Sequence, residues 1–263
     1  MTHTPMPKAI PVVTLLLCLV CPSWAQEIVF APDVSDRELL ETLFEGVWNR
    51  QDAECVWAPN LAERLQFGGT EDGFLYTQVD TSFNYETSDG RYRRVITSTY
   101  RKLGGEKEFC HACAPVISEI ELRYDPEAST YSLDSFGKYV TSSGSWGDMG
   151  RVSLQPIGKD IYCTRLDGAY DANGILSESI TLIYQGRVVL QLFPAGDNEG
   201  TALAESDVYH FESDVRIDKA RQILILHTIG TEPVDTDGLF RVVPVNRIIR
   251  YQFTDGVFEK MCD

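Results

Sequence analysis

Alternating apolar and polar positions dominate the chain after about residue 70. Ile120, Leu122 and Tyr124 alternate with Glu121 and Arg123, and this period of two is typical of a β-strand with one solvated face. Other segments are rich in aromatic and β-branched residues, which fit a half-buried pleated surface. The predicted strands cover residues 74–79, 92–100, 120–124, 131–133, 180–184, 187–193, 215–217, 223–227, 248–253 and 257–261.

Short polar turns separate several of these strands and predict hairpins. The clearest are Ser88-Asp89-Gly90, Gln185-Gly186, Asp218 to Arg221 and Thr254-Asp255-Gly256. We therefore expect a mainly β fold of antiparallel sheets, sandwich-like or barrel-like. One continuous domain over residues 26–263 is the expected organisation, and two sub-lobes, 26–147 and 148–263, are the alternative.

One segment near the N-terminus has helical rather than strand periodicity. Ser35 can cap this helix, and Glu38 three residues later completes a capping box. We expect an amphipathic helix over about residues 36–50, packed on a sheet through one apolar stripe. The stripe consists of Leu39, Leu40, Leu43, Phe44 and Val47.

The first 25 residues have the pattern of a secretory signal peptide. Lys8 precedes an apolar run from Ala9 to Val20, and Ser23-Trp24-Ala25 places small residues at a cleavage site. The run is shorter than the roughly 20 residues that a membrane-spanning helix needs. We therefore expect a mature chain beginning near Gln26, with no membrane span after cleavage and a periplasmic or extracellular location.

The chain is strongly acidic. Its formal net charge is −16, and removal of residues 1–25, whose one charged residue is Lys8, changes this to −17. Such a surface repels phosphate backbones, which argues against nucleic-acid binding. An unknown protein or small ligand, cationic in character, fits the charge better.

Five cysteines remain after cleavage: Cys55, Cys110, Cys113, Cys163 and Cys262. Disulfides are the default in an oxidising compartment, and an odd number leaves at least one thiol free or bonded to another molecule. We expect structural bonds that join Cys110 and Cys113 to each other or to Cys55, and Cys163 to Cys262.

The sharpest local motif is Cys110-His111-Ala112-Cys113. A thiol–disulfide role would place such a pair at the start of a helix, where the dipole lowers a thiol pKa. Here Val116 to Ile120 reads as a strand instead. Zinc would need a fourth ligand, which His210 or Cys163 could supply from a distance in the sequence. The sequence favours a structural motif without metal or cofactor, and redox and metal roles stay as alternatives.

A second candidate binding feature is Trp146, which lies in the glycine-rich turn Gly144 to Gly147. A tryptophan presented by such a turn can stack on a sugar or anchor a peptide. The alternative is that its ring folds back to cover the core.

Three motifs together resemble a loose set of exported bacterial proteins of unassigned function. They are Cys-His-Ala-Cys-Ala-Pro followed by a strand, Gly-Ser-Trp-Gly, and Ile157-Gly158-Lys-Asp160-Ile-Tyr162. The resemblance covers about residues 108–193. It implies a β-rich periplasmic or cell-surface protein and assigns no catalytic residue. Cys55 and Cys262 fall outside it.

The sequence therefore favours a non-enzymatic binding or interaction protein of the bacterial envelope, with no residue assigned a catalytic role. The alternative is a thiol–disulfide or metal-dependent envelope enzyme that uses Cys110, His111 and Cys113. The candidate binding residues are these three and Trp146.

Overall fold

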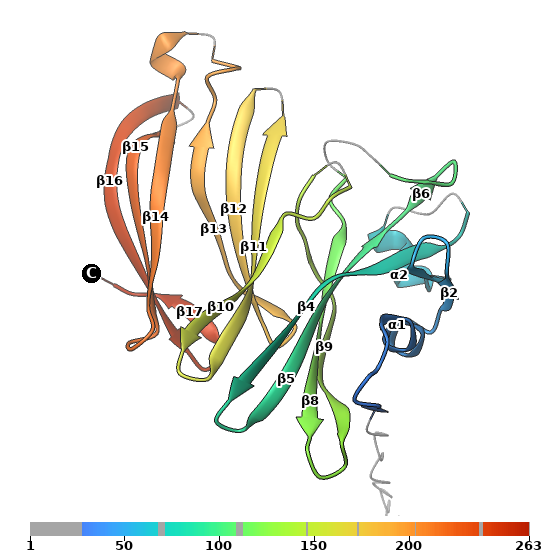
Figure 1. Ribbon diagram of the computed structural model, residues 1–263. Helices are drawn as coiled ribbons and strands as arrows, with labels where there is room; N and C mark the ends of the chain where they lie inside the picture. Colours follow the sequence, from blue (N-terminus) through green and yellow to red (C-terminus); the bar gives the residue numbers. More distant parts are fainter. Residues whose placement is uncertain are drawn as a thin grey trace, which may run out of the picture.

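The computed structural model describes residues 28–67, 72–108, 113–145, 147–172, 174–202, 204–236 and 239–262. Within these ranges the chain is mainly β, and every strand pair is antiparallel. The strands form two large sheets that lie side by side and a small two-stranded sheet (Figure 1). The prediction of a mainly β fold with antiparallel sheets is confirmed.

The first sheet has seven strands in the order β1-β9-β8-β5-β4-β3-β2. Its strands are β1 (Val29–Phe30), β2 (Val47–Asn49), β3 (Glu54–Trp57), β4 (Leu75–Thr87), β5 (Gly90–Tyr100), β8 (Val116–Asp125) and β9 (Thr130–Ser142). Strands β6 (Lys102–Leu103) and β7 (Glu106–Lys107) make the small sheet.

The second sheet has eight strands, and their order in the sheet is their order in the chain. They are β10 (Arg151–Gly158), β11 (Ile161–Ala172), β12 (Ile175–Tyr184), β13 (Arg187–Asp197), β14 (His210–Asp218), β15 (Ile223–Thr236), β16 (Leu239–Thr254) and β17 (Val257–Lys260). The predicted turns at Gln185-Gly186, Asp218 to Arg221 and Thr254-Asp255-Gly256 all fall at hairpins of this sheet.

The expected N-terminal helix is present as α1 (Asp36–Phe44), and the side chain of Ser35 accepts a hydrogen bond from the Glu38 amide. It ends at Phe44, not near residue 50. Glu45 is in the left-handed conformation, and Val47 begins β2 with 72% of its surface exposed. The chain turns there because Gly46 passes close to β3, where an added Cβ would lie 2.5 Å from Cys55 Sγ.

Two further helical segments were not predicted. One is α2 (Leu61–Gln66), which begins with a complete capping box between Asn60 and Glu63. The other is the short 3-10 helix η1 (Glu205–Asp207). In the ranges described, neither α-helix has the length and apolar character that crossing a membrane would require.

Helix α1 packs on one face of the first sheet. Leu39 joins a buried cluster with Val95 and Ile120, and Leu40 and Phe44 join another with Trp57, Leu75 and their neighbours. The apolar stripe predicted from the sequence is therefore the packing surface, apart from Val47. The second sheet encloses its own core, whose buried members include Ile157, Cys163, Leu182, Leu224, Leu226 and Phe253.

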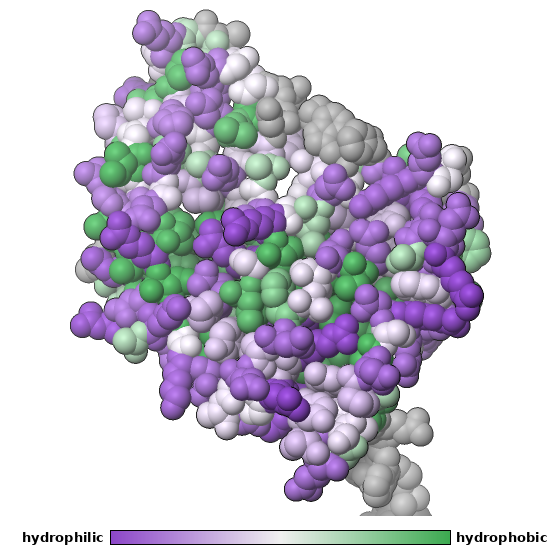
Figure 2. All heavy atoms as spheres, viewed as in Figure 1, coloured by the Kyte–Doolittle hydropathy of each residue, from purple (hydrophilic) through white to green (hydrophobic). Residues whose placement is uncertain are grey.

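The two sheets share a third buried cluster. Ile96 and Ile117 from the first sheet pack against Leu166 and Ile183 from the second. The chain passes from one sheet to the other between β9 and β10, close to the sub-lobe boundary considered from the sequence. Because one cluster contains side chains of both sheets, we keep the single continuous domain as the preferred organisation. Figure 2 shows apolar side chains in a broken band across the middle of one face, over both sheets.

Candidate functional site

The structure brings together the two motifs that the sequence singled out. The amide of Gly147, from the glycine-rich turn, donates a hydrogen bond to the carbonyl oxygen of Cys113 at 2.6 Å. Cys113 lies just before β8, and Gly147 lies in the connection between the two sheets. Cys110, His111 and Trp146 lie outside the described residues. Of the four candidate binding residues, Cys113 is thus the one whose surroundings can be described.

Gly147 is held by a close backbone approach. Its φ is +75°, and a Cβ at this position would lie 2.7 Å from the carbonyl oxygen of Glu108. Both its conformation and the available space therefore require glycine. The turn also closes on itself, because Ser145 and Asp148 exchange backbone hydrogen bonds of 3.1 and 3.0 Å.

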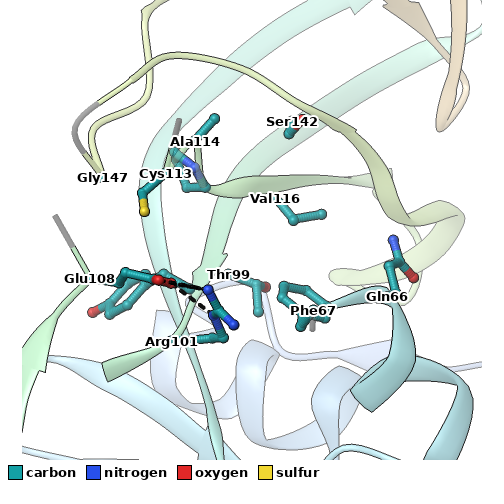
Figure 3. A pocket seen from close by; sticks show the side chains of 12 residues that line it. Gln66, Phe67, Thr99, Arg101, Glu108, Cys113, Ala114, Val116, Ser142 and Gly147 are labelled. Atoms are coloured by element: carbon teal, nitrogen blue, oxygen red, sulfur yellow. Dashed lines mark hydrogen bonds and ion pairs between the residues drawn. The ribbon is translucent and has the colours of Figure 1, made fainter. Parts of the chain in front are cut away.

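A cleft of about 230 Å³ opens beside this contact (Figure 3). Residues from α2, the end of β5, the start of β8, the end of β9 and the two motifs line it. We call it the Cys113 cleft. Its lining residues are Gln66, Phe67, Thr99, Tyr100, Arg101, Glu108, Cys113, Ala114, Pro115, Val116, Ser142 and Gly147.

Arg101 and Glu108 are paired in the wall of the Cys113 cleft (Figure 3). The guanidinium donates from Nε to Oε2 at 2.7 Å and from Nη2 to Oε1 at 2.6 Å. Such a two-point contact is the strong geometry for an arginine and a carboxylate. The two charges largely cancel, so neither group projects a free charge into the cleft.

The hydroxyl of Tyr100 is also engaged. It donates to the buried carboxylate of Glu54 at 2.6 Å, and Lys102 Nζ contacts the same carboxylate at 2.6 Å. Burial, followed by the hydrogen bond to Glu54, raises the pKa of Tyr100. Lys107 Nζ lies 4.5 Å from the centre of its ring. Tyr100 therefore contributes a ring and a neutral phenol to the cleft.

Asp80 lies on the same face of the first sheet as Tyr100 and Ser98. Its Oδ1 accepts hydrogen bonds from Ser98 Oγ and Gln78 Nε2, both at 3.1 Å. Its Oδ2 is buried and has no partner in the described part of the chain. Burial outweighs the two hydrogen bonds and raises the pKa of this carboxyl.

The cysteines depart from the expected pairing. Cys113 is disulfide-bonded, and its expected partner Cys110 lies outside the described residues. Cys55, Cys163 and Cys262 are free, so the expected bond between Cys163 and Cys262 is not formed, and Cys55 is not the partner of Cys113. Cys163 is sealed in the core of the second sheet, whereas Cys262 is exposed beyond β17. Those positions prevent the two sulfurs from meeting.

The local structure after Cys113 is a strand, as predicted. The chain passes through Ala114 and Pro115 into β8 at Val116, so no helix begins at this cysteine. Cys163 and His210, the distant residues considered as zinc ligands, lie on β11 and β14 of the second sheet. Within the described ranges, no three His, Cys, Asp or Glu side chains form a group that could hold a metal.

The sequence did not reveal a buried charge network between the sheets. Glu119 and Glu121 are both nearly sealed from solvent and surround Arg94. Arg94 also donates to the Tyr162 carbonyl oxygen of the second sheet at 2.8 Å. Glu119 accepts hydrogen bonds from Thr164 and from the Gly186 amide. The sequence pattern placed Glu121 on a solvated face of its strand, whereas the structure buries it beside its cation.

No family model, no curated protein and no solved structure matches this chain. The resemblance to exported bacterial proteins therefore stays a prediction.

Proposed function

We propose that this chain is an exported, non-enzymatic binding protein of the bacterial envelope, and that its ligand is held in the Cys113 cleft. The ligand is a protein segment or small molecule of cationic character. The observation that carries the proposal is that the two sequence motifs meet at this cleft through the contact between Gly147 and Cys113.

The reactive groups that line the cleft are already paired, which favours ligand binding over catalysis. Arg101 and Glu108 neutralise each other, the Tyr100 hydroxyl is held by Glu54, and Cys113 has no free thiolate because it is disulfide-bonded. The rings of Phe67 and Tyr100 line the cleft together with the polar side chains of Gln66 and Ser142. Aromatic walls with a few polar groups are typical of binding sites.

The net charge supports the cationic character of the ligand. A chain with a formal charge of −16 attracts cations over distances comparable to the Debye length, about 8 Å at physiological salt. This attraction accelerates association and does not by itself fix a binding site. The cleft would supply the specific contacts.

The test is fluorescence anisotropy with labelled lysine-containing and arginine-containing peptides, using the mature protein. Ser142→Trp fills the mouth of the cleft, and Ala220→Trp adds the same ring in the β14–β15 turn as a matched control. We expect peptide binding that weakens as salt rises, is lost in Ser142→Trp and is retained in Ala220→Trp. Equal peptide binding by both variants would show that binding depends on the overall charge of the protein, and it would refute the cleft as the binding site. The absence of binding to any peptide would refute the cationic character of the ligand.

Export is tested separately. The proposal requires an N-terminus near Gln26 on protein recovered from the envelope or medium, as measured by mass spectrometry. An intact N-terminus on protein found in the cytosol contradicts it.

A further inference from the structure

A second concave surface lies at the opposite end of the first sheet from the Cys113 cleft. The cleft is formed where β5 ends and β8 begins, whereas this surface is formed where β5 begins and β8 ends. Neighbouring strands contribute Asn84, Glu86, Arg91, Tyr124 and Tyr131, which we call the tyrosine ledge. The strand register places Glu86 opposite Arg91 and Tyr124 opposite Tyr131.

Two adjoining cavities give the ledge its shape. One has a volume of about 590 Å³ and is lined by all five ledge residues. The other has a volume of about 420 Å³ and lies toward the β4–β5 and β8–β9 turns. Arg91 and Tyr124 line both cavities, so the two adjoin at these side chains.

The rings and the guanidinium of the ledge are arranged around Tyr124. The rings of Tyr124 and Tyr131 have centroids 5.3 Å apart at an interplanar angle of 61°. The guanidinium carbon of Arg91 lies 4.2 Å from the centre of the Tyr124 ring. Arg91 packs on this ring in place of an ion pair with Glu86, its neighbour across the strands. The stacked guanidinium keeps its N–H edge available for hydrogen bonds.

The polar groups of the ledge have no hydrogen-bonding partners within the described part of the chain. Among the described residues, no hydrogen bond or ion pair reaches the side chains of Asn84, Glu86, Arg91, Tyr124 or Tyr131. The set contains donors in Arg91 and acceptors in Glu86, and the amide and phenols serve as both. It is therefore equipped for a ligand whose own polar groups both donate and accept.

Charge around the ledge argues against a strongly anionic ligand. Arg91 and Arg123 are accompanied by the carboxylates of Glu86, Asp89 and Asp125, which line the same two cavities. Asp89 accepts a hydrogen bond from Tyr92 at 2.9 Å, and hydrogen bonds from Thr87 and Tyr92 lower the pKa of its carboxyl. Asp89 therefore stays ionised at neutral pH. The local charge is nearly balanced, which suits an uncharged ligand.

We propose that the tyrosine ledge binds an uncharged saccharide. Hydroxyl groups on neighbouring ring carbons are donors and acceptors at once, and planar groups such as carboxylate, amide and guanidinium can engage two of them together. The apolar C–H face of a pyranose can lie against an aromatic ring, and tyrosine offers a broad ring with a polar edge. The ledge combines both features on strands of a sheet, and its position makes it independent of the Cys113 cleft.

The test is isothermal titration calorimetry of the mature protein with neutral trisaccharides: maltotriose, cellotriose and the N-acetylglucosamine trimer. A galacturonic acid trimer serves as the acidic probe. The variants are Tyr124→Ala, and Arg91→Met, which keeps an apolar stem over the ring. Tyr170→Ala removes an exposed tyrosine of β11, 46% exposed, as the matched control, and urea midpoints confirm that each variant is folded.

We expect at least one neutral trisaccharide to bind, with affinity lowered roughly tenfold or more in Tyr124→Ala and in Arg91→Met. Tyr170→Ala and the cleft variant Ser142→Trp should bind as the parent protein does. Three results would overturn the proposal: no neutral probe binds, affinity persists in Tyr124→Ala, or the acidic trimer binds more tightly than every neutral one. A failure of the peptide experiment at the cleft would leave these outcomes unchanged.

Discussion

Arg94 and Glu121 form a buried ion pair at the junction of the two sheets. Arg94 Nε lies 2.6 Å from Glu121 Oε2, and the two side chains are only 1% and 6% exposed. The same guanidinium donates to the Tyr162 carbonyl oxygen of β11. One arginine therefore joins two strands of the first sheet to a strand of the second.

Replacing this arginine should be strongly destabilising. Arg94→Met leaves Glu119 and Glu121 buried without their cation, so we expect the free energy of unfolding to fall by about 3–5 kcal/mol. Urea unfolding at neutral pH measures it. Arg123→Met is the control, because Arg123 and Asp89 form an exposed pair, 47% and 62% exposed, which should cost less than about 1 kcal/mol. Equal losses in the two variants would show that burial does not set the contribution of Arg94.

Neutralising Asp80 should stabilise the protein at neutral pH. Burial raises the pKa of Asp80 above its ordinary value of 3.8. The proton on Asp80 therefore stabilises the folded protein when the pH is below that ordinary pKa. This contribution to the free energy of unfolding is lost as the pH rises through the pKa of Asp80 in the folded state. Asp80→Asn carries no charge at any pH. We expect its free energy of unfolding to exceed that of the parent protein at about pH 7, by about 1 kcal/mol.

The difference should narrow as the pH falls toward about 4, because the parent then regains its proton on Asp80. Urea unfolding at a series of pH values measures it. Asp134→Asn makes the same charge change at an exposed position of β9 and should not reproduce the trend. A pH-independent difference would contradict the assignment to Asp80.

The three thiols that are free among the described residues should differ sharply in reactivity. Cys262 is exposed, whereas burial raises the pKa of Cys55 to about 11 and that of Cys163 to about 12. At about pH 8 both buried thiols are protonated and shielded, and a neutral thiol is a poor nucleophile. A thiol reagent should therefore label Cys262 in the native protein, and Cys55 and Cys163 only after unfolding.

Mass spectrometry of labelled peptides would identify the sites, and Cys262→Ser should abolish native labelling. Rapid labelling of Cys163 in the folded protein would contradict its place in the core of the second sheet.

Gly137 and Gly186 set how closely the sheets approach each other. A Cβ on Gly137 would lie 2.4 Å from the Cα of Gly186, in the β12–β13 turn. Gly137→Ala should therefore separate the sheets locally and destabilise the protein by about 1–3 kcal/mol. Gly104→Ala is the comparison, because Gly104 has a φ of +60° and open space around it, so it should cost only about 1 kcal/mol of backbone strain. Thermal unfolding of both variants measures the two losses of stability. A larger loss for Gly104→Ala than for Gly137→Ala would contradict the packing argument.

Local patterns predicted local structure well. The turn at Gln185-Gly186 and the strand after Pro115 were visible because alternation and turn residues act over a few positions. Helix α2 also carried a signal, since Asn60 and Glu63 have capping-box spacing, but its short length hid it. Helix α1 was predicted too long because Val47 continues the apolar stripe. The left-handed backbone of Glu45 and the close packing of Gly46 against β3 end the helix instead, and apolar periodicity encodes neither of them.

Contacts between distant residues could not be predicted in the same way. Arg94 meets Tyr162 from the other sheet, and no periodicity encodes that meeting. The pairing of cysteines has the same difficulty, because spacing alone does not determine connectivity. Of the candidate site, the sequence supplied the two motifs that meet where Gly147 contacts Cys113. The pair of Arg101 and Glu108 in the cleft wall depends on how β5 and the following turn fold together.

In the second sheet each strand is hydrogen-bonded to the strands before and after it in the chain. Every pairing from β10 to β17 can therefore form as soon as the next hairpin is available, without waiting for the C-terminus. Apart from the connection between β13 and β14, which contains η1, the loops that must close are short, and this favours rapid assembly. A chain threaded through a translocation channel from its N-terminus would build this half of the molecule by stepwise addition, so that β10 stays one edge of the growing sheet and the newest strand is the other.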